Sequence, residues 1–270
     1  MKRIFEIIGL LSLVMFSFFI TNKTAIVVKN MDDIMVEIKH NYKNYNIKSV
    51  DAVITNDTII PGISGRKVNI GKSYRSMKEY GKYNDELYVY DKVEPKVSIK
   101  DNKDKYIESG NKSIRQVSLS FVLKDNSDIK NILDILDNNG IKASFFVDET
   151  WITDNNYTAI DLIETGYTIG VNSDNEYNSW MDTIIKHVGK QKYGYCLYNE
   201  NNDCIKLDNY IIKTDILNRN YLMNIKKEIH NGSIIIMNDN GELYKELDSV
   251  INYIKSKGYE IVTLEKILTE

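Results

Sequence analysis

Apolar and polar positions in the second half of the chain follow two periodicities in turn. Residues 117–123 and 141–147 are apolar runs, and between them Ile129, Ile132 and Leu136 recur at helical spacing. The same patterns predict helices over 128–138, 157–165, 219–229 and 242–257, and strands over 117–123, 142–147, 167–171, 192–198, 209–213, 233–237 and 259–263. Strands and helices in alternation predict an α/β fold with parallel strands.

The region before residue 114 has shorter and more mixed patterns, which predict a small α/β region. We expect strands at 25–29 and 86–95, two strands around Asn56-Asp57, and helices over 31–42 and 70–81. The charged, turn-rich stretch 98–113 predicts a boundary. The sequence therefore predicts three parts: 1–23, 24–113 and 114–270.

The N-terminus carries the clearest targeting signal. Residues 4–20 are apolar except for Glu6, and they follow the basic pair Lys2-Arg3. The run is slightly shorter than the roughly 20 residues of a membrane span, and no small-residue cleavage site follows it. We expect an uncleaved, single-pass transmembrane helix with the bulk of the chain outside the cytoplasm, and a cleaved signal segment is the alternative.

Composition is that of a globular protein. Of the 270 residues 43% are hydrophobic and 27% charged, and the net charge is -3. The absence of a basic stripe in the sequence argues against a nucleic-acid partner.

Cys196 and Cys204 bracket a polar, turn-like stretch between two apolar runs. In an oxidising compartment the pair can close a small loop with a disulfide, and two free thiols are the equal alternative. The pair is incomplete as a metal motif, because no second pair of Cys or His residues supplies four ligands.

Five segments, in order and at matching spacing, resemble the polysaccharide deacetylase family, also called the NodB-homology domain or carbohydrate esterase family 4. They read VSLSF, GIKASFFV, LIETGYTIG, NGSIIIMND and SKGYEIVTLEKIL, and the resemblance covers nearly all of 115–268. It implies a distorted, incomplete (β/α) barrel that removes acetyl groups from chitin-like sugars, peptidoglycan or xylan. The family uses a divalent metal, often zinc, held by one Asp and two His, with an Asp as base and a His as acid.

Placed on this sequence, the family's functional positions carry other residue types. Val122 stands at the base and Leu123 at the metal-binding Asp, within Ser120-Phe121-Val122-Leu123-Lys124. Asn172 and Glu176 stand at the two metal-binding His. The acid position is Asn238, and Asp239 beside it is retained. The resemblance therefore implies a degenerate site, and we expect no cofactor.

Other polar and aromatic residues near these positions are candidates for glycan binding. They are Trp180, Asp174, Glu176 and Asp239. Solvated loop ends are the commoner role for such residues, and packing is the commoner role for both Trp151 and Trp180. His40, His187 and His230 fall at no motif position, so we interpret them as surface residues.

The sequence thus predicts a membrane-anchored cell-envelope protein with a degenerate deacetylase-like barrel that binds a glycan or a partner protein. An active deacetylase with an atypical metal site is one alternative. A pure interaction protein, whose N-terminal region is the functional part, is another. The substrate class in each case comes from fold-level analogy.

Overall fold

The computed structural model describes residues 2–124, 129–172, 191, 194–198 and 209–270. The side chains of residues 2–10, 22 and 24–28 are outside this description. The chain forms two compact units. Unit 1 comprises Met1–Ser49 and Ser64–Val93, and unit 2 comprises Val50–Ile63 and Glu94–Glu270.

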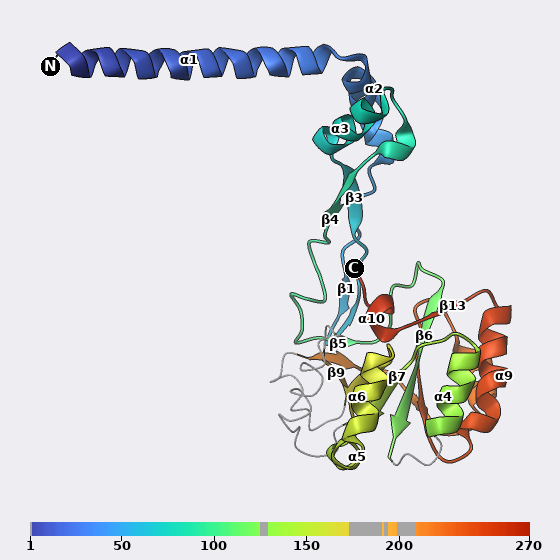
Figure 1. Ribbon diagram of the computed structural model, residues 1–270. Helices are drawn as coiled ribbons and strands as arrows, with labels where there is room; N and C mark the ends of the chain where they lie inside the picture. The colour runs from blue at the N-terminus through green and yellow to red at the C-terminus, as the bar shows by residue number, and fades with distance from the viewer. Residues whose placement is uncertain (1, 125–128, 173–190, 192–193, 199–208) are drawn as a thin grey trace. The chain divides into compact units, whose positions relative to one another are not determined.

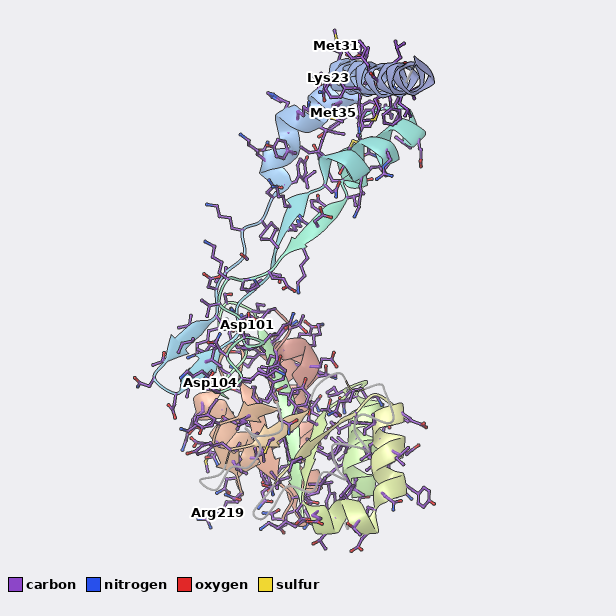
Figure 2. All side chains as sticks on the ribbon, turned by 90° about the vertical axis from the view of Figure 1, so that its left-hand side faces the viewer. Lys23, Met31, Met35, Asp101, Asp104 and Arg219 are labelled. Carbon is purple, nitrogen blue, oxygen red and sulfur yellow. The ribbon has the colours of Figure 1, made fainter. Side chains whose placement is uncertain are left out.

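Unit 1 contains helices and one two-stranded sheet. Its elements are α1 (Lys2–Met31), α2 (Asp33–Asn41), η1 (Tyr42–Tyr45), β3 (Gly65–Val68), α3 (Ile70–Tyr80), η2 (Asp85–Leu87) and β4 (Tyr90–Val93), with β3 antiparallel to β4. Asp32 caps α2 by accepting the Ile34 N–H at 3.0 Å, and Gly81, at φ 94°, ends α3. Met35 is buried while Met31 is exposed (Figure 2).

The predicted strand at 25–29 is wrong, because these residues continue the helix that begins at Lys2. Among the described residues no helix is both long and apolar enough to cross a membrane, so the structure does not support the expected transmembrane helix. The apolar run is interrupted after residue 20, where Thr21-Asn22-Lys23-Thr24 follow within the same helix.

Within its described residues, unit 2 is built on one sheet of eleven strands (Figure 1). The order is β1-β2-β5-β10-β9-β8-β7-β6-β12-β11, and β13 also pairs with β6. The strands are β1 (Val53–Thr55), β2 (Thr58–Ile60), β5 (Tyr106–Ile107), β6 (Gln116–Leu123), β7 (Ser144–Val147), β8 (Thr168–Val171), β9 (Tyr195–Leu197), β10 (Tyr210–Ile212), β11 (Ile216–Leu217), β12 (Ile234–Asn238) and β13 (Glu260–Val262). All pairings except β1 with β2 are parallel in this sheet, as predicted.

Helices cover one face of the sheet. They are α4 (Ile129–Asn138), α5 (Glu149–Asp154), α6 (Asn156–Glu164), α8 (Tyr221–Glu228) and α9 (Leu243–Ser256), while α10 (Leu264–Ile267) packs on the other face. In Figure 1, α4 and α9 lie side by side along β6. The sheet with its helices has the curled, incomplete (β/α) barrel form that the sequence predicts for this part of the chain.

Two hydrophobic clusters lie on the two faces of this sheet. The helix-side cluster contains Leu119, Phe121 and Leu123 of β6 with the apolar faces of the helices. The inner cluster is on the opposite face: Ala52, Ile59, Ile99, Ile107, Val122, Phe146, Tyr195, Leu197, Tyr210, Ile212, Ile234, Ile236, Val262, Leu264, Ile267 and Leu268. The alternation of side chains along each strand separates the two clusters.

The division into units differs from the predicted boundary at residue 113. Ile59, Ile99 and Ile107 precede that boundary, yet they belong to the inner cluster of the barrel. The hairpin β1-β2, with Asn56 in its turn at φ 54°, extends the barrel sheet through β5. Residues 50–63 and 94–113 are therefore part of the barrel unit.

Candidate degenerate active site

Val122 and Leu123, the last two residues of β6, point to opposite faces of the sheet. Val122 is 3% exposed and lies in the inner cluster, whereas Leu123 is fully buried in the helix-side cluster. Successive side chains of a strand alternate in direction, so the two do not face a common cavity. The residues at the base and metal positions are thus both part of hydrophobic cores.

An apolar row crosses three strands at the level of Val122. The register pairs Val122 with Phe146 on β7, and Phe146 with Gly170 on β8. A Cβ atom on Gly170 would lie 2.4 Å from the Phe146 ring, so the ring occupies the space above the glycine. Hydrocarbon therefore fills the end of the strands where the family's chemistry requires a base.

Asn238 ends β12 next to Val122. Its Nδ2 donates to Asn218 Oδ1 at 3.1 Å, and its backbone oxygen accepts the Tyr221 hydroxyl at 2.7 Å. A side-chain amide has no proton to transfer near neutral pH, so Asn238 holds the strand end and cannot replace a catalytic acid. Its Oδ1 is buried and has no hydrogen-bond partner within the described part of the chain.

Tyr221, at the start of α8, also cannot serve as an acid or base near neutral pH. Burial, together with the charges of Asp239, Glu246 and Glu242, raises its pKa to about 12. The phenol therefore stays protonated and donates to the backbone of Asn238.

The retained carboxylate, Asp239, stabilises the turn after β12. Its backbone N–H donates to Val122 O at 2.9 Å, and its Oδ1 accepts the Gly241 N–H at 3.1 Å. Asp239 is half-buried and directly follows the end of β12.

Asn172 follows β8, is half-buried, and donates its backbone N–H to Val147 O at 2.8 Å. Four further residues singled out in the sequence, Asp174, Glu176, Trp180 and His187, lie outside the described residues. Trp151 is 2% exposed in the helix-side cluster, which is the packing role that the sequence favours. His40 and His230 are exposed.

The described donor set does not fit a divalent metal. Leu123 has no donor atom, and Asn172 offers only a neutral amide in place of an imidazole. Within the described ranges there is no group of three or more His, Cys, Asp or Glu side chains arranged to hold a metal ion. The described side chains therefore do not provide the ligands of a divalent metal at this site.

Gln191 has a structural role that the sequence did not reveal. Its Oε1 accepts the Ile169 N–H at 2.9 Å, and its Nε2 donates to Ile169 O at 2.8 Å. The side-chain amide thereby acts as a strand partner for β8, which pairs with β9 in register at Val171.

Cys196 lies on β9, fully buried, and is bonded in a disulfide. The chain contains two cysteines, and Cys204 lies outside the described residues.

Comparison with known proteins identifies the fold. No family model matches the chain. The uncharacterized protein YlxY of Bacillus subtilis is 25% identical over 288 residues, covering 92% of this chain and 87% of that protein.

The crystal structure of a family 4 carbohydrate esterase pseudoenzyme from Bacillus anthracis aligns with a TM-score of 0.62 and 21% identity, over 89% of this chain and 96% of that one. A mutant of that pseudoenzyme with restored enzymatic activity aligns with a TM-score of 0.61 and 21% identity, over 88% of this chain and 99% of that one. These likenesses show the fold.

Proposed function

The chain has the polysaccharide deacetylase fold, and on that premise we propose that it is a catalytically degenerate deacetylase-like protein of the cell envelope. The apolar row Val122, Phe146 and Gly170 carries the proposal. Hydrolysis in this family needs a base and a metal-activated water at the place where these residues pack. The likeness to a structure described as a pseudoenzyme supports it.

We propose that the mouth of the barrel binds a cell-wall glycan or an envelope protein without turning it over. Asn238 supports a binding role, because its buried Oδ1 is an acceptor with no partner in the described chain. Asp239 is a second acceptor beside the strand ends, and the sequence candidates Asp174, Glu176 and Trp180 belong to the same proposal. A sedimentation assay with insoluble peptidoglycan tests binding, with Asn238→Ala and Asp239→Asn as the variants expected to weaken it.

The first prediction is that the protein releases no acetate from acetylated amino-sugar polymers, with or without zinc. General acid–base catalysis alone contributes about 10²–10⁴ in rate, and neither Val122 nor Asn238 can transfer a proton. Acetate release measured before and after addition of a chelator checks it. Chelator-sensitive turnover by the unmodified protein would establish an atypical active site instead.

A rescue variant provides the positive control for that assay. It combines Val122→Asp, Leu123→Asp, Asn172→His, Glu176→His and Asn238→His. We expect it to bind zinc tightly only if the aspartate introduced at position 123 turns from the helix-side cluster toward the mouth of the barrel. Leu123→Asp alone should destabilise the barrel, because Leu123 is fully buried in the helix-side cluster. Failure of the fivefold variant to bind zinc would show that side chain 123 differs from the metal-binding Asp of the family in its direction as well as in its residue type.

We propose from the sequence that the N-terminal segment holds the protein at a membrane, with the rest of the chain outside the cytoplasm. The support is the apolar run after Lys2-Arg3, and the large apolar side chains between Leu11 and Ile20, which are each 48–74% exposed. The disulfide at Cys196 supports an oxidising compartment. The second prediction is that the full-length protein fractionates with membranes. Recovery of a soluble, N-terminally trimmed form alone contradicts it.

A further inference from the structure

Arg219 is exposed at the mouth of the barrel, where β11 and β12 end, and it stands clear of the ribbon at the lower end of unit 2 (Figure 2). The parallel register of these strands places Leu217 opposite Met237. The residues that follow are Asn218 and Asn238, and Asn238 Nδ2 donates to Asn218 Oδ1 at 3.1 Å. The loop that carries Arg219 therefore borders the position where the family has its catalytic acid.

Hydrogen bonds hold the backbone of this loop in place. The backbone oxygen of Asn218 accepts Asn240 Nδ2 at 2.8 Å, and Asn218 Nδ2 donates to Ile216 O at 3.2 Å. Asn224 Nδ2 donates to the backbone oxygen of Arg219 at 3.0 Å. A side chain on such a fixed backbone loses less conformational freedom on binding a ligand than one on a mobile loop.

The guanidinium group of Arg219 has no ion pair with a carboxylate of the described part of the chain. The carboxylates of Asp239, Glu242 and Glu246, which follow β12, each have another partner. A guanidinium group offers a planar fork of N–H donors that matches the two oxygens of a carboxylate. Arg219 is therefore available at the mouth for the carboxylate of a ligand.

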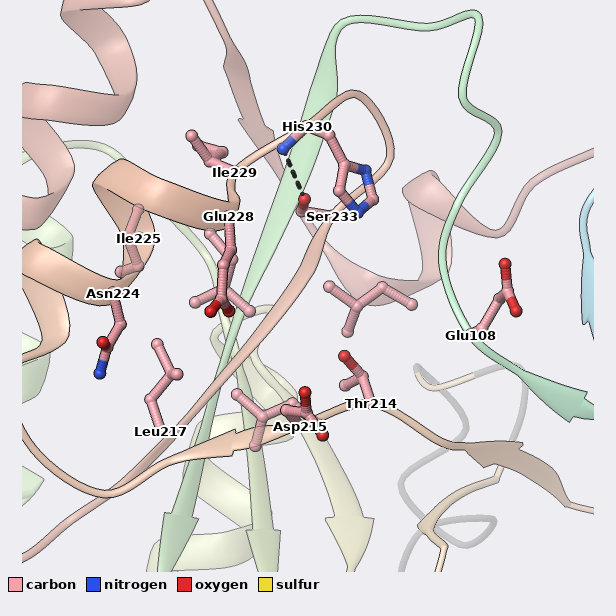
Figure 3. Close-up of a pocket in the computed structure, with 13 residues that line it drawn as sticks. Glu108, Thr214, Asp215, Leu217, Asn224, Ile225, Glu228, Ile229, His230 and Ser233 are labelled. Carbon is pink, nitrogen blue, oxygen red and sulfur yellow. Dashed lines mark hydrogen bonds between the residues drawn. The ribbon is translucent and has the colours of Figure 1, made fainter.

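The pocket beside the start of β12 offers no comparable group (Figure 3). It has a volume of about 180 Å³, and its described lining contains neither Lys nor Arg. Ile234–Ile236 along it are 0–7% exposed, whereas Asp215 and Glu228 present exposed carboxylates. An anionic ligand is therefore favoured at the mouth and not in this pocket.

We propose that Arg219 binds the carboxylate of an acidic cell-wall sugar, and that it makes the mouth selective for such glycans over neutral ones. This inference rests on the proposed glycan-binding role of the mouth. Two parallel, charge-assisted hydrogen bonds to a carboxylate are stronger than hydrogen bonds to neutral sugar hydroxyls. The carboxylates that follow β12 repel an anion, so its binding depends on direct contact with Arg219.

The test measures two affinities of the full-length protein in detergent by calorimetry. One ligand is the disaccharide of N-acetylglucosamine and N-acetylmuramic acid, which carries a carboxylate, and the other is its methyl ester. We expect the ester to bind the unmodified protein about tenfold more weakly than the acid. Arg219→Gln should lower the affinity for the acid by about the same factor and leave that for the ester unchanged.

Lys227→Gln is the matched control, because it removes a positive charge from an exposed position of the neighbouring helix α8. It should leave both affinities unchanged. Equal losses in the two variants, or equal binding of acid and ester by the unmodified protein, overturn the role of Arg219 and leave glycan binding standing. Binding of neither ligand, with no sedimentation on peptidoglycan, overturns the proposed binding function as well. Tighter binding of a glycerol phosphate oligomer than of the acid would assign Arg219 to a phosphate polymer and overturn the inference.

Discussion

At the scale of single residues, the side-chain amide of Gln191 pairs with the backbone of β8 in the way that a neighbouring strand does. Two hydrogen bonds to Ile169 satisfy backbone groups of a fully buried residue of β8. The third prediction is that Gln191→Ala lowers the free energy of unfolding by about 2–4 kcal/mol, because both backbone groups lose their partner. Urea titration measures the loss.

Gln116 provides the matched control. It is the chain's other glutamine with a described side chain. Its Nε2 donates a hydrogen bond to Glu260 Oε2 at 2.7 Å on the protein surface. Gln116→Ala should change stability by no more than about 0.5 kcal/mol. Gln191→Glu keeps the acceptor for the Ile169 N–H and loses the donor to Ile169 O. The free energy of unfolding of this variant should therefore lie between those of the wild type and Gln191→Ala. Equal effects of the two alanine variants would contradict a strand-partner role.

At the scale of elements, Glu270 ties three distant segments together. Its Oε1 accepts the Gly62 N–H at 2.8 Å, and its Oε2 accepts the Ser98 hydroxyl at 2.6 Å and the Ile99 N–H at 3.2 Å. Glu270 is 8% exposed, so these charge-assisted bonds are shielded from water. These hydrogen bonds join the end of the chain to Gly62 and to Ser98-Ile99, which precede and follow the segment 64–93.

The fourth prediction concerns this junction. Glu270→Ala should lower the stability of the barrel unit by about 2–3 kcal/mol, because it removes a charged acceptor and leaves buried donors unpaired. Hydrogen exchange should accelerate at the amides of Gly62 and Ile99. Glu265→Ala, in α10 five residues before Glu270, should leave both amides protected. Unchanged exchange at Gly62 in the Glu270 variant would show that the junction is held by packing instead.

At the scale of the whole molecule, unit 2 should fold without unit 1. Its two pieces flank residues 64–93, and Gly65 pairs with Val93 across the β3-β4 ladder. Paired residues lie only about 5 Å apart, so a short linker can join residue 63 to residue 94. The fifth prediction is that residues 50–63, a linker of glycine and serine, and residues 94–270 form a cooperative domain, seen as a single unfolding transition by circular dichroism.

A fragment of residues 114–270 is the informative comparison. It matches the boundary predicted from the sequence, but it lacks Ile59, Ile99 and Ile107 of the inner cluster. Loss of these buried side chains should leave it less stable and prone to aggregate, since each contributes on the order of 1.5–3 kcal/mol. A fragment of 114–270 as stable as the linked form would restore the predicted boundary.

The sequence by itself determined most elements of the barrel. It also determined which catalytic residue types of the family are replaced at the ends of the strands. Apolar periodicity located β6, α4, β7 and α9 to within a few residues, because each element has to bury one side or both. The motif spacing identified Val122, Leu123 and Asn238 at positions where side-chain type alone excludes a base, a ligand or an acid.

Only the tertiary structure decided which residues share a core and which apolar side chains pack at the strand ends in place of the catalytic residues. The Phe146 ring over Gly170, the partnership of Gln191 with Ile169 and the reach of Glu270 to Gly62 all join residues far apart in the chain. Such contacts depend on strand register and on the direction of each side chain, and local sequence patterns do not fix either across long separations. The membership of residues 50–63 in the barrel unit follows from the same long-range pairing.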